Sequence, residues 1–224
     1  MTRTLLVVAG GEQPLPSITA VAPSPDLVIG VDSGVDTAIA LGYVVDVAVG
    51  DFDSVSAAGL AAAERSGALV ERHPVDKDQT DLELALLKAV SYLPDLIIVI
   101  GLGGGRADHY LANLLLLASP RFQAVHIDAY VGDAKFSVVR SERTLAGRVG
   151  ELVSLLPIGG EVTGISTSGL QYKLSNETLR ATSPRGVSNT LTTPLAKVTV
   201  GDGALLVVQP DRLVKDWPAT AGGK

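Results

Sequence analysis

Five short aliphatic runs divide the chain up to about residue 130, and they constrain the fold more than any other feature. Each is rich in Val, Ile and Leu without regular polar alternation, which predicts a strand buried on both faces. The stretches between the runs carry apolar residues at helical spacing. Alternating strands and helices predict a mostly parallel sheet with flanking helices. The runs are TLLVVAG, DLVIGVD, DVAVGD, DLIIVIGL and AVHIDAY.

The pattern changes after about residue 132. Short apolar segments are then separated by Gly, Ser, Asn and Pro, and no long helical period remains. The GDG sequence at 201–203 predicts a tight turn between two β-rich runs. This half is typical of an antiparallel β-sandwich or barrel. We therefore expect an α/β domain over residues 1–134, followed by an all-β domain over residues 135–224.

Composition excludes several classes of protein. The net charge of -6 argues against general binding to nucleic acid or to anionic membranes. The absence of cysteine excludes disulfides, zinc–thiolate sites and a thiol nucleophile. The apolar run near the N-terminus is too short for a signal peptide core or a membrane span. We expect a soluble cytoplasmic protein.

Acidic side chains follow two of the predicted strands. Asp32 ends DLVIGVD, Asp51 ends DVAVGD, and Asp53 comes two residues later. A glycine-rich loop, GLGGGR, follows DLIIVI. Ligands of open α/β sheets bind beyond the carboxyl ends of the strands, so we expect these groups to share one edge of the sheet.

Two further aspartates, Asp78 and Asp81, stand at the start of the predicted helix QTDLELALLKAV and share a helical face. Either could instead be a carboxylate favoured by the helix dipole, and Asp78 or Thr80 could cap the helix. Oxygen ligands without His or Cys suit Mg²⁺, which is often held by one or two carboxylates and substrate phosphates. The aspartates therefore predict a divalent-cation site for a phosphorylated substrate.

The stretch GLGGGRADH at 101–109 complements these carboxylates. Its glycines let backbone amides approach an anion, and Arg106 adds a fork of donors to phosphate. It is neither a Walker A loop nor a complete dinucleotide fingerprint. A plain tight turn, with an Arg106–Asp108 salt bridge, is the structural alternative.

Taken together, these segments resemble the thiamine pyrophosphokinase family. The matching stretches occur in the family's order and cover most of the chain. They are VDSGVD (31–36), GDFDS (50–54), KDQTDLELAL (77–86), GGRADH (104–109), GLQYKL (169–174) and GVSNT (186–190).

The resemblance implies that ATP donates its β,γ-pyrophosphoryl group to the hydroxyl of thiamine, giving thiamine diphosphate and AMP. It also implies an α/β catalytic domain that binds ATP and a β-sandwich domain that binds thiamine. A homodimer is implied as well, with thiamine held between the α/β domain of one subunit and the β domain of the other.

The family's roles transfer to matching positions of this sequence. The implied catalytic residues are Asp32, Asp51, Asp53, Asp81 and Asp108, of which Asp51, Asp53 and Asp81 would hold Mg²⁺. The implied ATP contacts are Lys77, Asp78, Gly104, Gly105, Arg106 and His109. The implied thiamine contacts are Tyr172, Ser188 and Asn189.

This sequence departs from the family pattern in three places. Ser33 replaces a frequent glycine, Tyr172 replaces a frequent tryptophan, and Thr190 replaces a frequent glutamate. Three alternatives stay open at this point: a pyrophosphokinase for another small alcohol such as a hydroxymethylpterin, a non-catalytic thiamine or nucleotide sensor, and an NAD-dependent oxidoreductase. The last leaves the aspartates unexplained.

Overall fold

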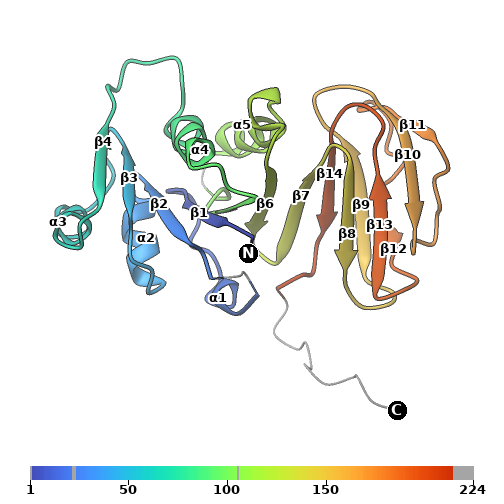
Figure 1. Cartoon of the computed structure of the whole chain (residues 1–224), viewed down its shortest axis with the longest axis horizontal. Helices are drawn as coiled ribbons and strands as arrows, with labels where there is room; N and C mark the ends of the chain where they lie inside the picture. Colours follow the sequence, from blue (N-terminus) through green and yellow to red (C-terminus); the bar gives the residue numbers. More distant parts are fainter. Residues whose placement is uncertain (1, 22–23, 105, 214–224) are drawn as a thin grey trace, which may run out of the picture.

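The computed structural model describes residues 2–21, 24–104 and 106–213, which form a ten-stranded and a four-stranded sheet (Figure 1). The strands of the α/β half are β1 (Thr4–Val8), β2 (Leu27–Val31), β3 (Val47–Gly50), β4 (Leu69–Arg72), β5 (Leu96–Ile100) and β6 (His126–Val131). Those of the second half are β7 (Ala134–Val139), β8 (Glu142–Ala146), β9 (Leu152–Pro157), β10 (Val162–Ser168), β11 (Glu177–Leu179), β12 (Asn189–Thr190), β13 (Leu195–Thr199) and β14 (Leu205–Gln209). The helices are α1 (Ile18–Val21), α2 (Gly34–Ala40), α3 (Ala57–Arg65), α4 (Asp81–Ser91), α5 (Ala107–Leu117) and the 3₁₀ turn η1 (Pro120–Phe122).

The large sheet has the order β12-β9-β14-β7-β6-β5-β1-β2-β3-β4. The six strands from β6 to β4 are parallel to one another. Each predicted strand and helix of the first half is present, and the predicted mostly parallel sheet is confirmed. The sequence did not predict the short helix α1.

Helices cover both faces of this parallel region and bury separate apolar cores. Residues of α4, α5 and η1 pack with one set of strand side chains, including Leu86, Leu117 and Phe122. On the other face, α1, α2 and α3 pack against the alternate side chains through Ile18, Val35 and Ala63. Both faces are apolar because successive strand residues point to opposite sides.

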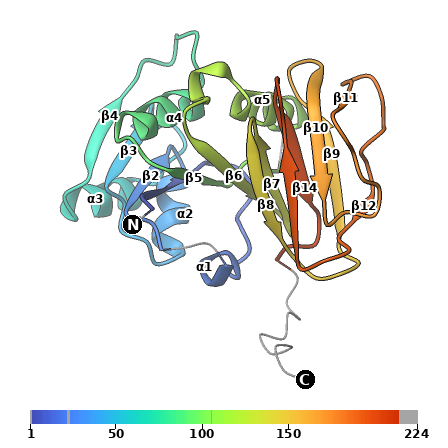
Figure 2. The same cartoon turned by 45° about the vertical axis from the view of Figure 1, so that its right-hand side comes forward.

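The same sheet continues into the second half through antiparallel pairs of β6 with β7, β7 with β14, and β14 with β9. The four-stranded sheet, β11-β10-β13-β8, packs against this extension and encloses a third core. Figures 1 and 2 show β4 and β12 at opposite ends of the molecule. The predicted antiparallel β-sandwich is confirmed, although one of its layers belongs to the sheet of the α/β half.

The turn at 201–203 connects two different sheets. It follows β13, which pairs with β8 and β10, and leads to β14, which pairs with β7 and β9. The turn that the sequence predicted between these two β-rich runs therefore does not connect the strands of a β-hairpin.

A buried ion cluster joins the two layers. Asp128 on β6, with a side chain only 4% exposed, accepts a 2.5 Å hydrogen bond from Arg143 on β8 and pairs with Lys135 at 2.9 Å. Removing Asp128 would leave Arg143 and Lys135 without their common counter-ion. The sandwich is thereby fixed against the sheet that carries the pocket described below.

The proposed boundary between residues 134 and 135 falls at the start of β7, within continuous sheet pairing. It stays a prediction. Within the described residues, no helix is long and apolar enough to cross a membrane.

Candidate active site

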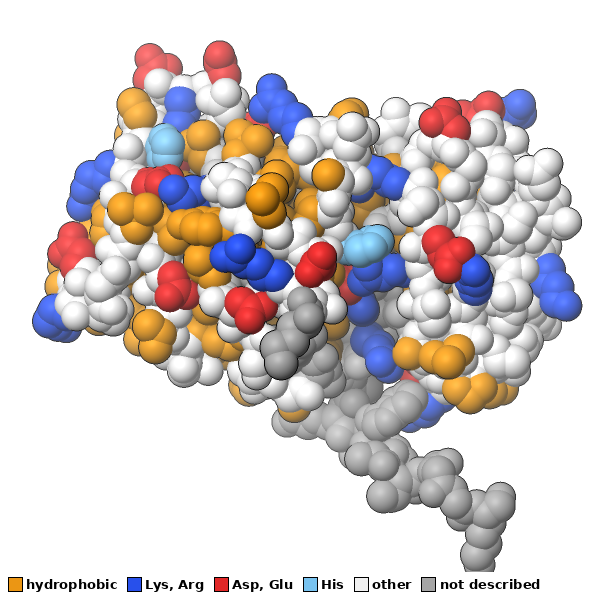
Figure 3. Space-filling model, viewed as in Figure 1, with side chains coloured by type: hydrophobic (Ala, Val, Ile, Leu, Met, Phe, Trp, Pro, Cys, Tyr) orange, Lys and Arg blue, Asp and Glu red, His pale blue; other side chains and the backbone are white. Residues whose placement is uncertain are grey.

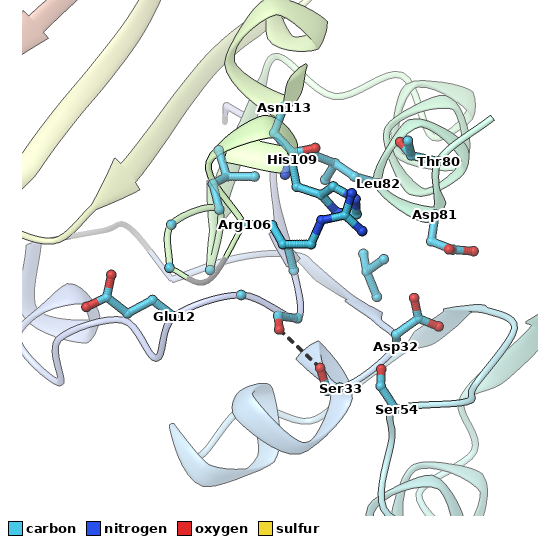
Figure 4. A pocket seen from close by; sticks show the side chains of 18 of the residues that line it. Glu12, Asp32, Ser33, Ser54, Thr80, Asp81, Leu82, Arg106, His109 and Asn113 are labelled. Carbon is cyan, nitrogen blue, oxygen red and sulfur yellow. Dashed lines mark hydrogen bonds between the residues drawn. The ribbon is translucent and has the colours of Figure 1, made fainter. Parts of the chain in front are cut away.

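The strand order reverses beside β1, because β2, β3 and β4 follow on one side whereas β5 and β6 lie on the other. Such a switch point opens a crevice at the carboxyl ends of the strands. A pocket of about 870 Å³ lies there (Figure 4). Its lining comes from residues 9–12 after β1, 31–33 after β2, Ser54, residues 80–82, residues 101–104 after β5, and Arg106, His109, Ala112 and Asn113.

The loop after β1, which contains Gly10 and Gly11, lies beside the glycine-rich loop after β5. The N–H of Gly11 donates to the carbonyl of Gly101 at 2.9 Å, and that of Glu12 donates to Gly103 at 2.5 Å. These two amides are therefore used within the chain. Arg106 is the N-cap residue of α5 but makes no side-chain cap hydrogen bond. The Arg106 side chain is therefore the charged donor that an anion would meet at this edge.

Asp32 is held tightly at the end of β2. Its backbone has a φ of 46°, in the left-handed region that aspartate tolerates better than most residues. Its Oδ1 accepts the N–H of Phe52 at 3.2 Å. A Cβ on Gly50 would lie 1.8 Å from that oxygen, so only glycine leaves room for the carboxylate. The strand end and the following loop therefore fix the direction of Asp32.

Burial raises the pKa of the Asp32 carboxyl from 3.8 to about 6. The charges of Asp81, Asp51 and Asp53 push the pKa the same way, while the hydrogen bond from Phe52 opposes them. Each of these three carboxylates is thus close enough to Asp32 to repel its charge. A cation among them would relieve this repulsion.

The carboxylates converge without forming a preassembled cage. Within the described residues, no group of three or more His, Cys, Asp or Glu side chains could hold a metal ion as it stands. Asp81 Oδ1 is buried without a hydrogen bond, although Lys77 Nζ forms an ion pair with it at 3.0 Å. Hard oxygen donors and one unsatisfied buried oxygen fit a divalent cation whose coordination is completed by substrate phosphates.

Arg106 and Asp108 form an exposed pair on the first turn of α5, with Arg106 NH2 donating to Asp108 Oδ2 at 2.6 Å. This hydrogen bond lowers the pKa of the Asp108 carboxyl to about 2. The salt bridge considered from the sequence is therefore present. It does not prevent Arg106 from lining the pocket, where Figure 4 shows it between Asp81 and Glu12.

The pocket brings together some of the residues selected from the sequence and leaves others outside its lining. Those that line it are Asp32, Asp81, Gly104, Arg106 and His109, whereas Asp51, Asp53, Lys77, Asp78 and Asp108 lie outside. Gly105 lies outside the described residues. Thr80, not Asp78, caps α4, because its Oγ1 accepts the N–H of Glu83 at 3.2 Å.

Among the lining residues with polar side chains, five were not selected as site residues from the sequence: Glu12, Ser33, Ser54, Thr80 and Asn113. Asn113 follows His109 by four residues on α5, so helical spacing could have identified it. Ser33 donates to the carbonyl of Gly10 at 3.2 Å and links the loops after β1 and β2. Its replacement of a glycine therefore adds a contact.

The residues expected at thiamine lie elsewhere in the chain. Four strands separate β12, which begins at Asn189, from β5. Tyr172 is 63% exposed and Ser188 is also exposed. Asn189 is buried and ties the Tyr172 backbone in place, with its Oδ1 accepting Tyr172 N–H at 3.0 Å and its Nδ2 donating to Tyr172 O at 2.8 Å. One chain therefore does not bring Tyr172 to the pocket at the switch point.

A crevice at the switch point of a parallel sheet, lined by Asp32, Asp81 and Arg106 and accompanied by an antiparallel β domain, has the architecture of an α/β enzyme. Residues 19–129 match the model of the thiamin pyrophosphokinase catalytic domain, and residues 138–205 match that of the thiamin pyrophosphokinase vitamin B1 binding domain. The chain belongs to the thiamine pyrophosphokinase family.

Individual relatives agree with this assignment. Thiamine pyrophosphokinase from Bacillus subtilis is 29% identical over 217 residues, covering 92% of this chain and 98% of that protein. The crystal structure of the Bacillus subtilis enzyme superposes with a TM-score of 0.81, at the same coverage of both chains. A family member from Enterococcus faecalis gives 0.75 at 28% identity, covering 93% and 98%. The Candida albicans enzyme shares the fold alone, with a TM-score of 0.77 at 14% identity, covering 93% and 89%.

Replacing Asp32 with Asn should stabilise the metal-free protein above neutral pH. The raised pKa means that Asp32 contributes stability below pH 4, and that this contribution is lost as pH rises through about 6. At pH 8 the Asp32→Asn variant should exceed the wild type by about 1–2 kcal/mol in free energy of unfolding. Urea denaturation without divalent metal, repeated from pH 4 to pH 8, measures the difference.

The difference should shrink toward pH 4, where both side chains are neutral. A difference that does not change over this range would contradict the electrostatic origin of the raised pKa.

Proposed function

We propose that this protein transfers the pyrophosphoryl group of ATP to the hydroxyl of thiamine, forming thiamine diphosphate and AMP. The observation that carries the proposal is the match of both halves of the chain to the two domains of one enzyme family. The comparisons give no support to a pterin alcohol as acceptor or to a non-catalytic sensor. The carboxylate-lined crevice offers a site at which this fold could carry out the reaction.

We assign the pocket at the switch point to ATP. Gly104, Arg106 and His109 lie along it and would face the polyphosphate and its nucleoside. Gly105 is part of this assignment from the sequence. Arg106 supplies the positive charge that stabilises the transferring group. Lys77 and Asp78 would stand beside the phosphates, with Lys77 leaving Asp81 for a phosphate oxygen.

The family's ATP-dependent chemistry generally needs a divalent metal ion, and we propose Mg²⁺ held by Asp51, Asp53 and Asp81. When bound, Mg²⁺ would neutralise the charge of the transferred phosphates. This assignment is supported by the pKa of Asp32, which burial and the charges of Asp81, Asp51 and Asp53 all raise.

We assign the general base to Asp32. Its carboxylate lines the pocket and is held in direction by the N–H of Phe52, so it could accept the proton of the attacking hydroxyl. Asp108, the other implied catalytic carboxylate considered for this role, is paired with Arg106 and lies outside the pocket lining. We place Asp108 instead as the residue that orients Arg106. The cytoplasmic location stays a prediction.

We assign thiamine to the exposed edge that carries Tyr172 and Ser188. An aromatic face suits a ligand with a permanent positive charge on its thiazolium ring. Asn189 would act chiefly by holding the backbone of Tyr172, since its Oδ1 and Nδ2 already bond within the chain. The Thr190 hydroxyl donates to Gln171 at 2.7 Å, so the position of the family's frequent glutamate is used in a local contact.

We further propose a homodimer in which Tyr172 of one copy completes the pocket of the other. The separation of the two groups of residues within one chain supports this arrangement. So does α5, where Leu111 and Leu115 are 59% and 51% exposed. Figure 3 shows apolar side chains gathered over this part of the surface. A second copy would cover them.

Product analysis tests the function directly. Purified protein with ATP, Mg²⁺ and thiamine should yield thiamine diphosphate and AMP in equal amounts, resolved by chromatography. EDTA should abolish both products, because the charge of the transferred group is then not neutralised. A parallel reaction with 6-hydroxymethylpterin in place of thiamine is the matched control and should yield no AMP.

Two results would contradict the proposal. Formation of ADP with thiamine monophosphate would mean that a different phosphate bond is cleaved. Turnover of the pterin alcohol without turnover of thiamine would mean that the acceptor is wrong.

Tyr172→Ala should raise the KM for thiamine about tenfold and leave the KM for ATP within about twofold, because the variant removes an aromatic wall from one substrate only. Tyr172→Phe is the matched control, since it keeps the ring, and should stay close to the wild type. Steady-state kinetics with each substrate varied in turn measures both constants. Equal effects on both substrates would remove Tyr172 from the thiamine site.

A further inference from the structure

The loop between β3 and α3 carries Asp51 and Asp53, and two carboxylates of one short segment hold its two ends. Asp32 lies at the end of β2, and Asp36 lies four residues later in α2. Asp32 accepts the N–H of Phe52, and Asp36 accepts that of Ser56. Each carboxylate thus accepts a hydrogen bond from the backbone N–H of the residue twenty positions later in the chain.

The contact at Asp36 is bidentate. The N–H of Ser56 donates to Asp36 Oδ2 at 2.7 Å, and the Ser56 hydroxyl donates to Asp36 Oδ1 at 2.6 Å. The same hydroxyl accepts the N–H of Gly59 at 3.0 Å and so caps α3. Hydrogen bonds to a carboxylate are stronger than those between neutral groups. The end of the loop is therefore hydrogen-bonded to α2, the helix against which α3 packs.

Glycines make room for both carboxylates. A Cβ on Gly50 would lie 1.8 Å from Asp32 Oδ1, and a Cβ on Gly59 would lie 1.9 Å from Asp36 Oδ1. Any other residue at Gly59 would push the Asp36 carboxylate away from Ser56. The two ends of the loop are thus built in the same way, although only Asp32 reaches the pocket.

We propose that Asp36 is a positioning residue for the metal-binding loop: it sets where Asp51 and Asp53 stand relative to Asp32 and Asp81. The inference rests on the proposed function, because it requires that Asp51 and Asp53 meet a divalent cation with ATP. Asp51 already accepts the N–H of Asp53 at 3.1 Å, which keeps the inside of the loop in one shape. The Asp36 contact then fixes the position of the loop relative to α2.

The role differs from that of an ordinary helix cap. An ordinary cap stabilises its helix wherever it lies, whereas the Asp36 contact joins two elements on either side of the aspartates. Asp46 provides a matched control, since its Oδ2 accepts the N–H of Val28 at 2.8 Å at the other end of β2. Losing that contact should weaken the fold without moving the loop.

The test measures binding of the Mn²⁺ complex of α,β-methylene-ATP to the protein, using the electron paramagnetic resonance spectrum of Mn²⁺ with the same complex without protein as the reference. In Asp36→Ala the affinity for this complex should fall about tenfold, because two charge-assisted bonds to the loop are lost. Asp36→Asn keeps an acceptor for the Ser56 N–H and a donor for its hydroxyl, so its affinity should stay within about threefold of the wild type. Asp46→Ala should lower the Tm and leave the affinity unchanged.

Wild-type affinity in a folded Asp36→Ala variant would overturn the proposal. Equal losses in Asp36→Asn and Asp36→Ala would also overturn it, because the charge and not the clamp would then matter. Failure of the proposed function is a separate result, since the wild type would then bind no Mn²⁺ with the nucleotide analogue. Comparison of Tm values separates loss of binding from loss of folding.

Discussion

The reversal of strand order beside β1 is the constraint on which the site depends. It places the ends of β1, β2 and β5 around one crevice, and the neighbouring end of β3 delivers the aspartate loop to the same edge. Backbone pairing alone produces this arrangement. Most of the residues that line the crevice follow a strand end directly or stand near the start of a helix.

The carboxylate of Asp32 lies in an unfavourable electrostatic environment in the crevice. Asp32 stands in a left-handed conformation, partly buried and repelled by three other carboxylates, and its pKa is raised as a result. Hydrogen bonds from Phe52 to Asp32 and from Ser56 to Asp36 hold the loop in spite of the repulsion. Strain of this kind at a functional site is offset by the surrounding fold.

Much of this could be predicted from the sequence, because periodicity reports burial. The aliphatic runs predicted the parallel strands, and the residues that follow them predicted the edge at which the site lies. Contacts that depend on tertiary geometry could not be predicted in this way. The sequence at 201–203 is typical of a hairpin turn, but the turn joins strands of two different sheets. Which strands pair depends on the core that each strand's side chains enter. Asp36 reads as a surface helical residue, because its partner Ser56 lies twenty positions away.

The resemblance to the family implies that thiamine lies between two subunits. Within one chain, Tyr172 is hydrogen-bonded to Asn189 at the start of β12, which lies four strands from β5. The account therefore predicts that each complete site is shared between two copies. The most direct test mixes Asp53→Asn protein with Tyr172→Ala protein after dissociation and reassociation, at a thiamine concentration where neither alone turns over appreciably. A shared site predicts recovery of up to about one quarter of wild-type activity, because half of the dimers then contain one intact site out of two. No recovery, with mixed dimers present, would mean that each chain completes its own site and would contradict the account.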